Sequence, residues 1–195
     1  MKNATYLFQN PFREYHHSES RWSAMAQIAL IWLSDKKISE IPIYIVDNDR
    51  LKVTHDKFII KEFTCGNTIV EGKMTGTPFQ INDWPNEFLN LSPDIVHWES
   101  SGKKAIIIEV KTIGATVERN TDVYSHLNSF LCSRGWESAL YYLISHGHEN
   151  NKDWVILKNA NARIILWEDI FIAIKDQPIA QLFDADLANY CERPE

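Results

Sequence analysis

The spacing of apolar residues along the chain predicts which segments form helices and which form strands. Near the N-terminus, apolar side chains recur three and four positions apart, which predicts a long helix packed on a core. The residues at this spacing are Trp22, Met25, Ala26, Ala29, Leu30 and Leu33. Asn10 and Pro11 have the order expected at a helix start, an Asn cap followed by Pro, and Glu14 is placed to complete a capping box.

The next segments are rich in β-branched residues and are separated by turn-forming residues, which predicts strands. The predicted strands are 41–46, 51–60, 68–74, 94–99 and 104–111, followed later by "DWVILK" and "ARIILW". The stretches "VERNTDVYSHLNSFL" and "WESALYYLISHG" are predicted to be helical, as are the segments from Glu168 and from Pro178. A helix, a run of strands, and then helices with two further strands predict an α/β fold with a central mixed sheet flanked by helices.

The length of 195 residues predicts one domain over 1–195, with a core at about 11–167 and a C-terminal helical segment at about 168–195. The longest early apolar stretch, "AMAQIALIWL", is too short and too interrupted to cross a bilayer, so we expect no membrane partner. The first residues lack the apolar segment of a signal peptide. Cys65, Cys132 and Cys191 lie far apart, as expected of reduced thiols, and together these features predict a cytoplasmic protein.

The formal net charge of −6 argues against a protein that coats nucleic acid by charge alone. A local basic groove is still possible, because many cations fall in the central and later part of the chain. They are Lys103, Lys104, Lys111, Arg119, Arg134, Lys152, Lys158 and Arg163. Among the aromatic residues, Trp84 and Trp98 could stack on a nucleobase, although anchoring of a core or loop is the simpler expectation.

The stretch "SPDIVHWESSGKKAIIIEVKT", residues 92–112, carries the candidate chemistry. If Ser101-Gly102 forms the turn of a hairpin, Glu99 faces Lys104 and the pairing continues outward until Asp94 faces Glu109. Their Cβ atoms would then lie ~5 Å apart on one face of the sheet. Lys111 follows Glu109 by two residues, so strand alternation places it on that same face.

Two carboxylates this close repel each other unless a cation or a shared proton lies between them. Mg²⁺ takes a few carboxylate oxygens and keeps water in its remaining positions, so the pair predicts a magnesium site. The Lys111 ammonium could orient or deprotonate a water, or stabilise negative charge on a phosphate. Because Ile106, Ile108 and Val110 face away from this site, the strand would hold its charged residues between two packed layers.

Pro93-Asp94, a turn, an apolar strand and then Glu109-Val110-Lys111 resemble the signature of the PD-(D/E)xK nuclease superfamily, whose fold is restriction-endonuclease-like. The resemblance implies an αβββαβ core and Mg²⁺-dependent hydrolysis of phosphodiester bonds in DNA, with Mn²⁺ able to substitute. It implies that Asp94, Glu109 and the Val110 carbonyl bind the metal and that Lys111 positions the attacking water.

The resemblance also implies an auxiliary acid from the first helix. Glu19 lies on the apolar stripe of that helix and is the candidate fourth metal ligand, while Glu14 has a sufficient role in the capping box. Some RecB-like members carry Gln-x-x-x-Tyr on the helix after the catalytic strand. The nearest stretch here, Glu137 to Tyr141, keeps the spacing and lacks the Gln, which argues against a RecB-like assignment.

Three alternatives remain open. Glu109 and Lys111 could be a structural ion pair on a half-exposed strand, with Asp94 in a turn before it. The chain could be a non-catalytic subunit that keeps the nuclease fold and acts as an interaction module in a larger complex. RNA is not excluded as the substrate. We expect a homodimer or a hetero-complex, because one small domain has little surface with which to grip a duplex.

Overall fold

The computed structural model describes residues 19–36, 40–60, 63–74, 78–99, 103–111, 117, 121–145 and 151–182, with the side chains of 19–21, 151, 152 and 182 excepted. Seven strands form one mixed sheet in the order β2-β1-β7-β6-β5-β4-β3. The strands are β1 (Glu40–Asp47), β2 (Arg50–Ile59), β3 (Thr68–Val70), β4 (Ile95–Trp98), β5 (Lys104–Val110), β6 (Glu137–Ile144) and β7 (Arg163–Leu166). The predicted α/β fold with a central mixed sheet is therefore confirmed.

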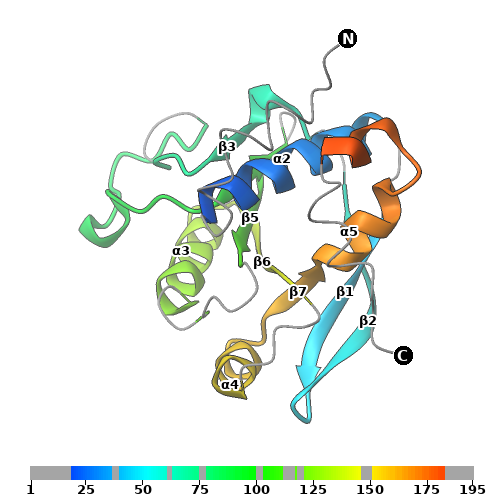
Figure 1. The fold of residues 1–195 in the computed structure, drawn as a ribbon. Helices are drawn as coiled ribbons and strands as arrows, with labels where there is room; N and C mark the ends of the chain where they lie inside the picture. Colours follow the sequence, from blue (N-terminus) through cyan, green and yellow to red (C-terminus); the bar gives the residue numbers. More distant parts are fainter. Residues whose placement is uncertain are drawn as a thin grey trace.

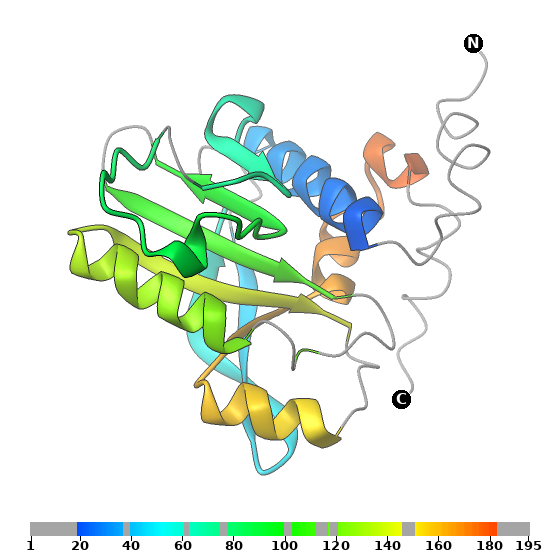
Figure 2. The same cartoon turned by 90° about the vertical axis from the view of Figure 1, so that its left-hand side faces the viewer.

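Among the residues that the structure describes, four α-helices flank this sheet. They are α2 (Glu19–Asp35), α3 (Thr121–Ser133), α4 (Asn151–Asn159) and α5 (Trp167–Ile174). Helices α2 and α5 bury their apolar residues on one face, together with Ile108 and Val110 of β5. Helices α3 and α4 cover the opposite face, where α3 packs on Ile107 of β5. Figures 1 and 2 show the sheet between these two helical layers.

The long N-terminal helix has the predicted buried stripe. All six residues of that stripe are buried in the core: Trp22, Met25, Ala26, Ala29, Leu30 and Leu33. Within the described residues this helix begins at Glu19, and the predicted start at Asn10 and Pro11 lies outside them. The strands predicted over 41–46 and 51–60 are also present, and the structure pairs them antiparallel as β1 and β2 around a turn in which Asn48 and Asp49 have positive φ.

Two predicted elements were wrong. "WESALYYLISHG" is mostly strand β6 and not a helix, because its residues pair with β5 on one side and β7 on the other. Leu143 and Ile144 point into opposite helical layers. Because β6 is covered on both faces, its sequence is a continuous apolar run without the alternation expected of a half-exposed strand. "DWVILK" lies in helix α4, where Trp154 and Leu157 are buried three residues apart while Val155 is exposed.

Strand β3 is shorter than the predicted 68–74, since Glu71 follows it with φ of 47°. The later predictions of strand "ARIILW" and of helical segments near Glu168 and Pro178 correspond to β7, α5 and the 3-10 helix η4 (Pro178–Leu182). Two further 3-10 turns are η2 (Cys65–Asn67) and η3 (Asn86–Phe88).

Strands β5, β6 and β7 run parallel, so their carboxyl ends meet at one edge of the sheet. Strand β4 runs antiparallel to β5, which places the start of β4 at the same edge. Residues that end β5 and residues that begin β4 are therefore neighbours. Ligand sites in open α/β sheets commonly lie at the carboxyl ends of parallel strands, and the candidate residues fall at this edge.

Candidate active site

The pairing of β4 with β5 has the register predicted from the Ser-Gly turn. Ile95 faces Ile108 and Trp98 faces Ala105, and beyond them the Glu99 N–H donates to the Lys104 carbonyl at 3.1 Å. The same register, extended one position past Ile95, aligns Asp94 with Glu109. Alternation puts both side chains on the α3 side of the sheet, the side of Val96 and Ile107.

The Asp94 carboxylate is held by the main chain of the neighbouring strand. The Val110 N–H donates a buried hydrogen bond of 2.7 Å to Asp94 Oδ2. The Asp94 carbonyl accepts a second hydrogen bond, from the Glu71 N–H at 3.0 Å, which ties the start of β4 to the end of β3. Asp94 is 9% exposed, so its position is determined by these main-chain contacts and not by solvent.

Glu109 and Lys111 form a buried ion pair across the α3 side of β5. Lys111 Nζ lies 2.7 Å from Glu109 Oε1, and the two side chains are only 6% and 3% exposed. The contact agrees with the prediction that strand alternation brings both side chains to one face. If Glu109 and Lys111 were only a structural ion pair, the sequence predicted that they would lie on a half-exposed strand. The predicted exposure was wrong, because α3, β6 and the loop before β4 enclose the end of β5.

The main chain of Lys111 is fixed from two sides, although β5 ends at Val110. Its N–H donates to the Leu143 carbonyl of β6 at 2.8 Å. Its carbonyl accepts a buried hydrogen bond of 3.3 Å from Trp167 Nε1, in the first turn of α5. The ammonium therefore starts from a rigid backbone position, as preorganised electrostatic interactions require.

Tyr124 of helix α3 completes the polar cluster, and sequence reasoning did not select it. Burial raises the pKa of the Tyr124 hydroxyl well above its usual value, and the negative charges of Glu109 and Asp94 and a hydrogen bond to Glu109 raise it further. Tyr124 therefore keeps its proton, and its hydroxyl donates a hydrogen bond to the Glu109 carboxylate. Its position in the buried stripe Thr121, Tyr124, Leu127 and Leu131 of α3 is the signal that could have indicated it.

Tyr142 of β6 lies next to Glu109, its partner in the β5–β6 register. Burial raises the pKa of Tyr142 to about 12, opposed by the neighbouring Thr121 side chain and the charge of Lys111. The candidate carboxylates thus lie between two tyrosines that remain neutral at ordinary pH. Such a surrounding lowers the local dielectric and strengthens electrostatic interactions at the site.

The residues present fit a small, hard cation. Asp94 and Glu109 supply carboxylates from adjacent strands, and the Val110 carbonyl is the main-chain oxygen that follows Glu109 in sequence. Mg²⁺ is held by one or two carboxylates, with water and phosphate oxygens in its other positions, so a complete protein cage is not needed. Across the part of the chain that the structure describes, no group of three or more His, Cys, Asp or Glu side chains is arranged to hold a metal ion.

The fourth predicted ligand is not tested by the structure. The Glu19 backbone begins helix α2, but its side chain lies outside the described residues. The stretch from Glu137 to Tyr141, which keeps the spacing of the RecB-like motif, lies on strand β6 and not on the helix that follows β5. That helix is α3, and its tyrosine near Glu109 is Tyr124.

A cleft lies at the other end of β4 and β5, away from these carboxylates. It has a volume of about 990 Å³ and includes Trp98 and Lys103, which flank the hairpin turn. Comparisons of the chain with protein-family models, with curated proteins and with solved structures found no match. Among the described residues, no helix is long and apolar enough to span a membrane.

Proposed function

We propose that this protein is a Mg²⁺-dependent nuclease that hydrolyses phosphodiester bonds in DNA. The observation that carries the proposal is the alignment of Asp94 with Glu109 on neighbouring strands, with Lys111 in contact with Glu109. Two acids on one face beside a lysine are the residue types that metal-assisted hydrolysis of a phosphodiester requires. Their place at the carboxyl end of β5 agrees with the usual position of ligand sites in such sheets.

The order of elements supports a restriction-endonuclease-like core. Helix α2, strands β3, β4 and β5, helix α3 and strand β6 follow one another in the αβββαβ order that the resemblance implies. The β1–β2 hairpin is inserted after the first helix, and β7 extends the sheet beside β6. Both additions leave the neighbourhood of β4 and β5 unchanged.

Each residue has a proposed role that its surroundings favour. Asp94, fixed by the Val110 N–H, would hold the metal from β4, and Glu109, held by Tyr124, would hold it from β5. Bound Mg²⁺ would polarise the phosphate and lower the pKa of a bound water. The Lys111 ammonium, 2.7 Å from Glu109, would orient the attacking water or stabilise negative charge on the phosphate.

The burial of the same residues favours a second candidate, a non-catalytic subunit that keeps the nuclease fold. A lysine 2.7 Å from Glu109 Oε1 in an enclosed site already balances the charge of that carboxylate without a metal. In this case Asp94, Glu109 and Lys111 would be structural, and the chain would act through a partner. The two candidates differ in whether the acids bind a divalent ion.

A cleavage assay with matched variants tests the proposal. Supercoiled plasmid, single-stranded and duplex DNA, and RNA of the same sequence are incubated with Mg²⁺ or Mn²⁺. Glu109→Gln, Lys111→Met and Asp94→Asn should each lower the cleavage rate by at least about a hundredfold. Asn is preferred at position 94 because its carbonyl can still accept the hydrogen bond from Val110.

The surface pair Lys104–Glu137 supplies the control. It joins the same strands, β5 and β6, with 3.4 Å between Lys104 Nζ and Glu137 Oε2, at exposed positions. Lys104→Met and Glu137→Gln should leave the cleavage rate unchanged within about twofold. Absence of cleavage of every substrate, together with calorimetry in which Glu109→Gln does not alter Mg²⁺ binding, would reject the nuclease and favour the non-catalytic subunit.

A further inference from the structure

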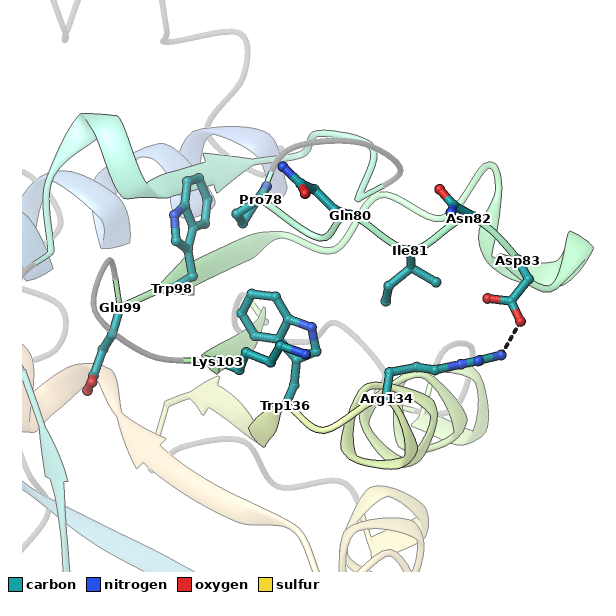
Figure 3. Close-up of a pocket in the computed structure, with 10 residues that line it drawn as sticks. All are labelled: Pro78, Gln80, Ile81, Asn82, Asp83, Trp98, Glu99, Lys103, Arg134 and Trp136. Carbon is teal, nitrogen blue, oxygen red and sulfur yellow. Dashed lines mark hydrogen bonds and ion pairs between the residues drawn. The ribbon is translucent and has the colours of Figure 1, made fainter.

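A second site lies at the hairpin end of the sheet, in the cleft of about 990 Å³. Four parts of the chain form it: the end of β4 with Trp98, Lys103 just before β5, the segment 78–83, and the turn after α3 with Arg134 and Trp136. Figure 3 shows the two indoles at one end of the cleft and Arg134 with Asp83 at the other. Along β4, Trp98 is four residues from Asp94, a separation of about 13 Å, so the cleft and the candidate active site are distinct.

The two tryptophans make the cleft unusual. Both are partly buried and line its open volume. Trp136 is held from behind, since its ring packs on Phe79 with 4.5 Å between centroids, and its main-chain N–H donates to the Leu131 carbonyl at 3.0 Å. An indole fixed in this way and still reachable from solvent loses little conformational entropy when a planar ring stacks on it.

The polar groups of the cleft are those that recognise nucleotides. Gln80 and Asn82 are exposed on the wall opposite α3, and amide side chains can donate to and accept from the edge of a base. Lys103 is an exposed cation at the tryptophan end. Arg134 pairs with Asp83 and lies 5.2 Å from the centre of the Phe130 ring, so its guanidinium is held in one orientation.

The charges of the cleft are balanced. Lys103 and Arg134 are offset by Asp83 and Glu99, and the Glu99 side chain extends away from the other labelled residues in Figure 3. A duplex attracted through its phosphates would need a surplus of cations. The indole rings and the amide side chains are therefore the features that can select a ligand here. Stacking on the indoles requires a ligand with an aromatic ring whose faces are free.

We propose that this cleft binds unpaired nucleobases of single-stranded DNA, with stacking on Trp98 and Trp136 as the main source of affinity. The proposal builds on the proposed nuclease function and assigns it a substrate with an unpaired strand. Bases within a duplex are already stacked on each other and cannot offer their faces to the indoles. The cleft would then hold an unpaired segment apart from the bond to be cut.

Fluorescence anisotropy tests the proposal without any cleavage. A labelled 12-nucleotide oligothymidylate and a 12-base-pair duplex are titrated with the full chain in EDTA. We expect the single strand to bind at least about tenfold more tightly than the duplex, and Trp98→Ala to weaken its binding at least about tenfold. Trp98→Phe, which keeps an aromatic ring, should retain most of the affinity.

Trp32→Ala is the matched control, because Trp32 is also partly buried but lies on helix α2, on the opposite face of the sheet. It should change binding less than about twofold, and circular dichroism should show that each variant is folded.

Because the charges of the cleft balance, the dissociation constant should change little between low and physiological salt.

Equal affinity of Trp98→Ala and the original chain would overturn the proposal, as would preference for the duplex or no binding of the single strand at 100-fold excess of protein. Glu109→Gln separates this result from the nuclease, because it should abolish cleavage and leave binding unchanged. If single-strand binding depends on Trp98 but no metal supports cleavage, the proposed nuclease function is rejected and the proposed binding of unpaired bases in the cleft is supported.

Discussion

Replacement of Lys111 by Met removes the positive partner of a buried carboxylate. The Lys111 and Glu109 side chains are 6% and 3% exposed, and 2.7 Å separates Nζ from Oε1. At that distance the attraction is about 6 kcal/mol for an effective dielectric constant of ~20, and desolvation of both groups offsets much of it. Removing one partner leaves the other charge buried, so we expect Lys111→Met to lower the free energy of unfolding by about 3–5 kcal/mol.

A double-mutant cycle isolates the pair from other effects of each substitution. Glu109→Gln, Lys111→Met and the double variant are unfolded in urea at pH 7 with EDTA, followed by far-ultraviolet circular dichroism. The double variant should lose less stability than the sum of the single losses, by at least about 2 kcal/mol, because neither charge is left alone. The dependence of the free energy of unfolding on urea should be unchanged, since each variant exposes the same surface.

The exposed pair Lys104–Glu137 provides the reference for this coupling. Its side chains are 48% and 76% exposed, and a cycle with Lys104→Met and Glu137→Gln should give a coupling energy below about 1 kcal/mol. If the coupling of Lys111 with Glu109 is no larger than that of this surface pair, the two groups are not a buried ion pair in solution. Such a result would refute a buried ion pair at the end of β5.

Three further predictions concern the rest of the molecule. Burial raises the pKa of Tyr142 to about 12 from 10, so its contribution to stability is complete below pH 10 and is lost as the pH rises toward 12. Unfolding titrations should show a loss of up to about 1.4 kcal/mol per pH unit in that window, reduced in Tyr142→Phe. In α4, Leu157→Ala should lower the free energy of unfolding by about 2–5 kcal/mol and Val155→Ala by less than about 0.5 kcal/mol, because Leu157 is buried and Val155 is exposed. In a strand these two residues would share a face, and one would not be buried while the other is exposed. We expect a homodimer or a hetero-complex, so sedimentation at micromolar concentration should detect an assembly larger than one chain, and a strict monomer would contradict this expectation.

Much of the fold could be predicted from local patterns. The stripe of α2, the β1–β2 hairpin and the β4–β5 register each depend on residues close together in sequence. The register is the most informative, because a two-residue turn determines every later pair and therefore the alignment of Asp94 with Glu109. The alternation of β5 predicted in the same way that Lys111 shares a face with Glu109.

Patterns of this kind failed where a segment is covered on both sides. Strand β6 lies between β5 and β7 and between two helical layers, so its apolar residues have no period that separates a strand from a helix. Helix α4 is short, and its Val155 and Ile156 favour strands locally, but packing of Trp154 and Leu157 on the sheet decides its structure.

The sequence by itself determined the fold class, the hairpin register and the residue types of the candidate site. Only the tertiary structure decided their surroundings. The burial of Glu109 and Lys111, the hydrogen bond from Tyr124, and the shared cleft of Trp98 and Trp136 each depend on packing between segments far apart in the chain. Spacing along a strand determines which side chains share a face, but the elements that cover that face, and thus its dielectric and its access to solvent, are set by packing over long range.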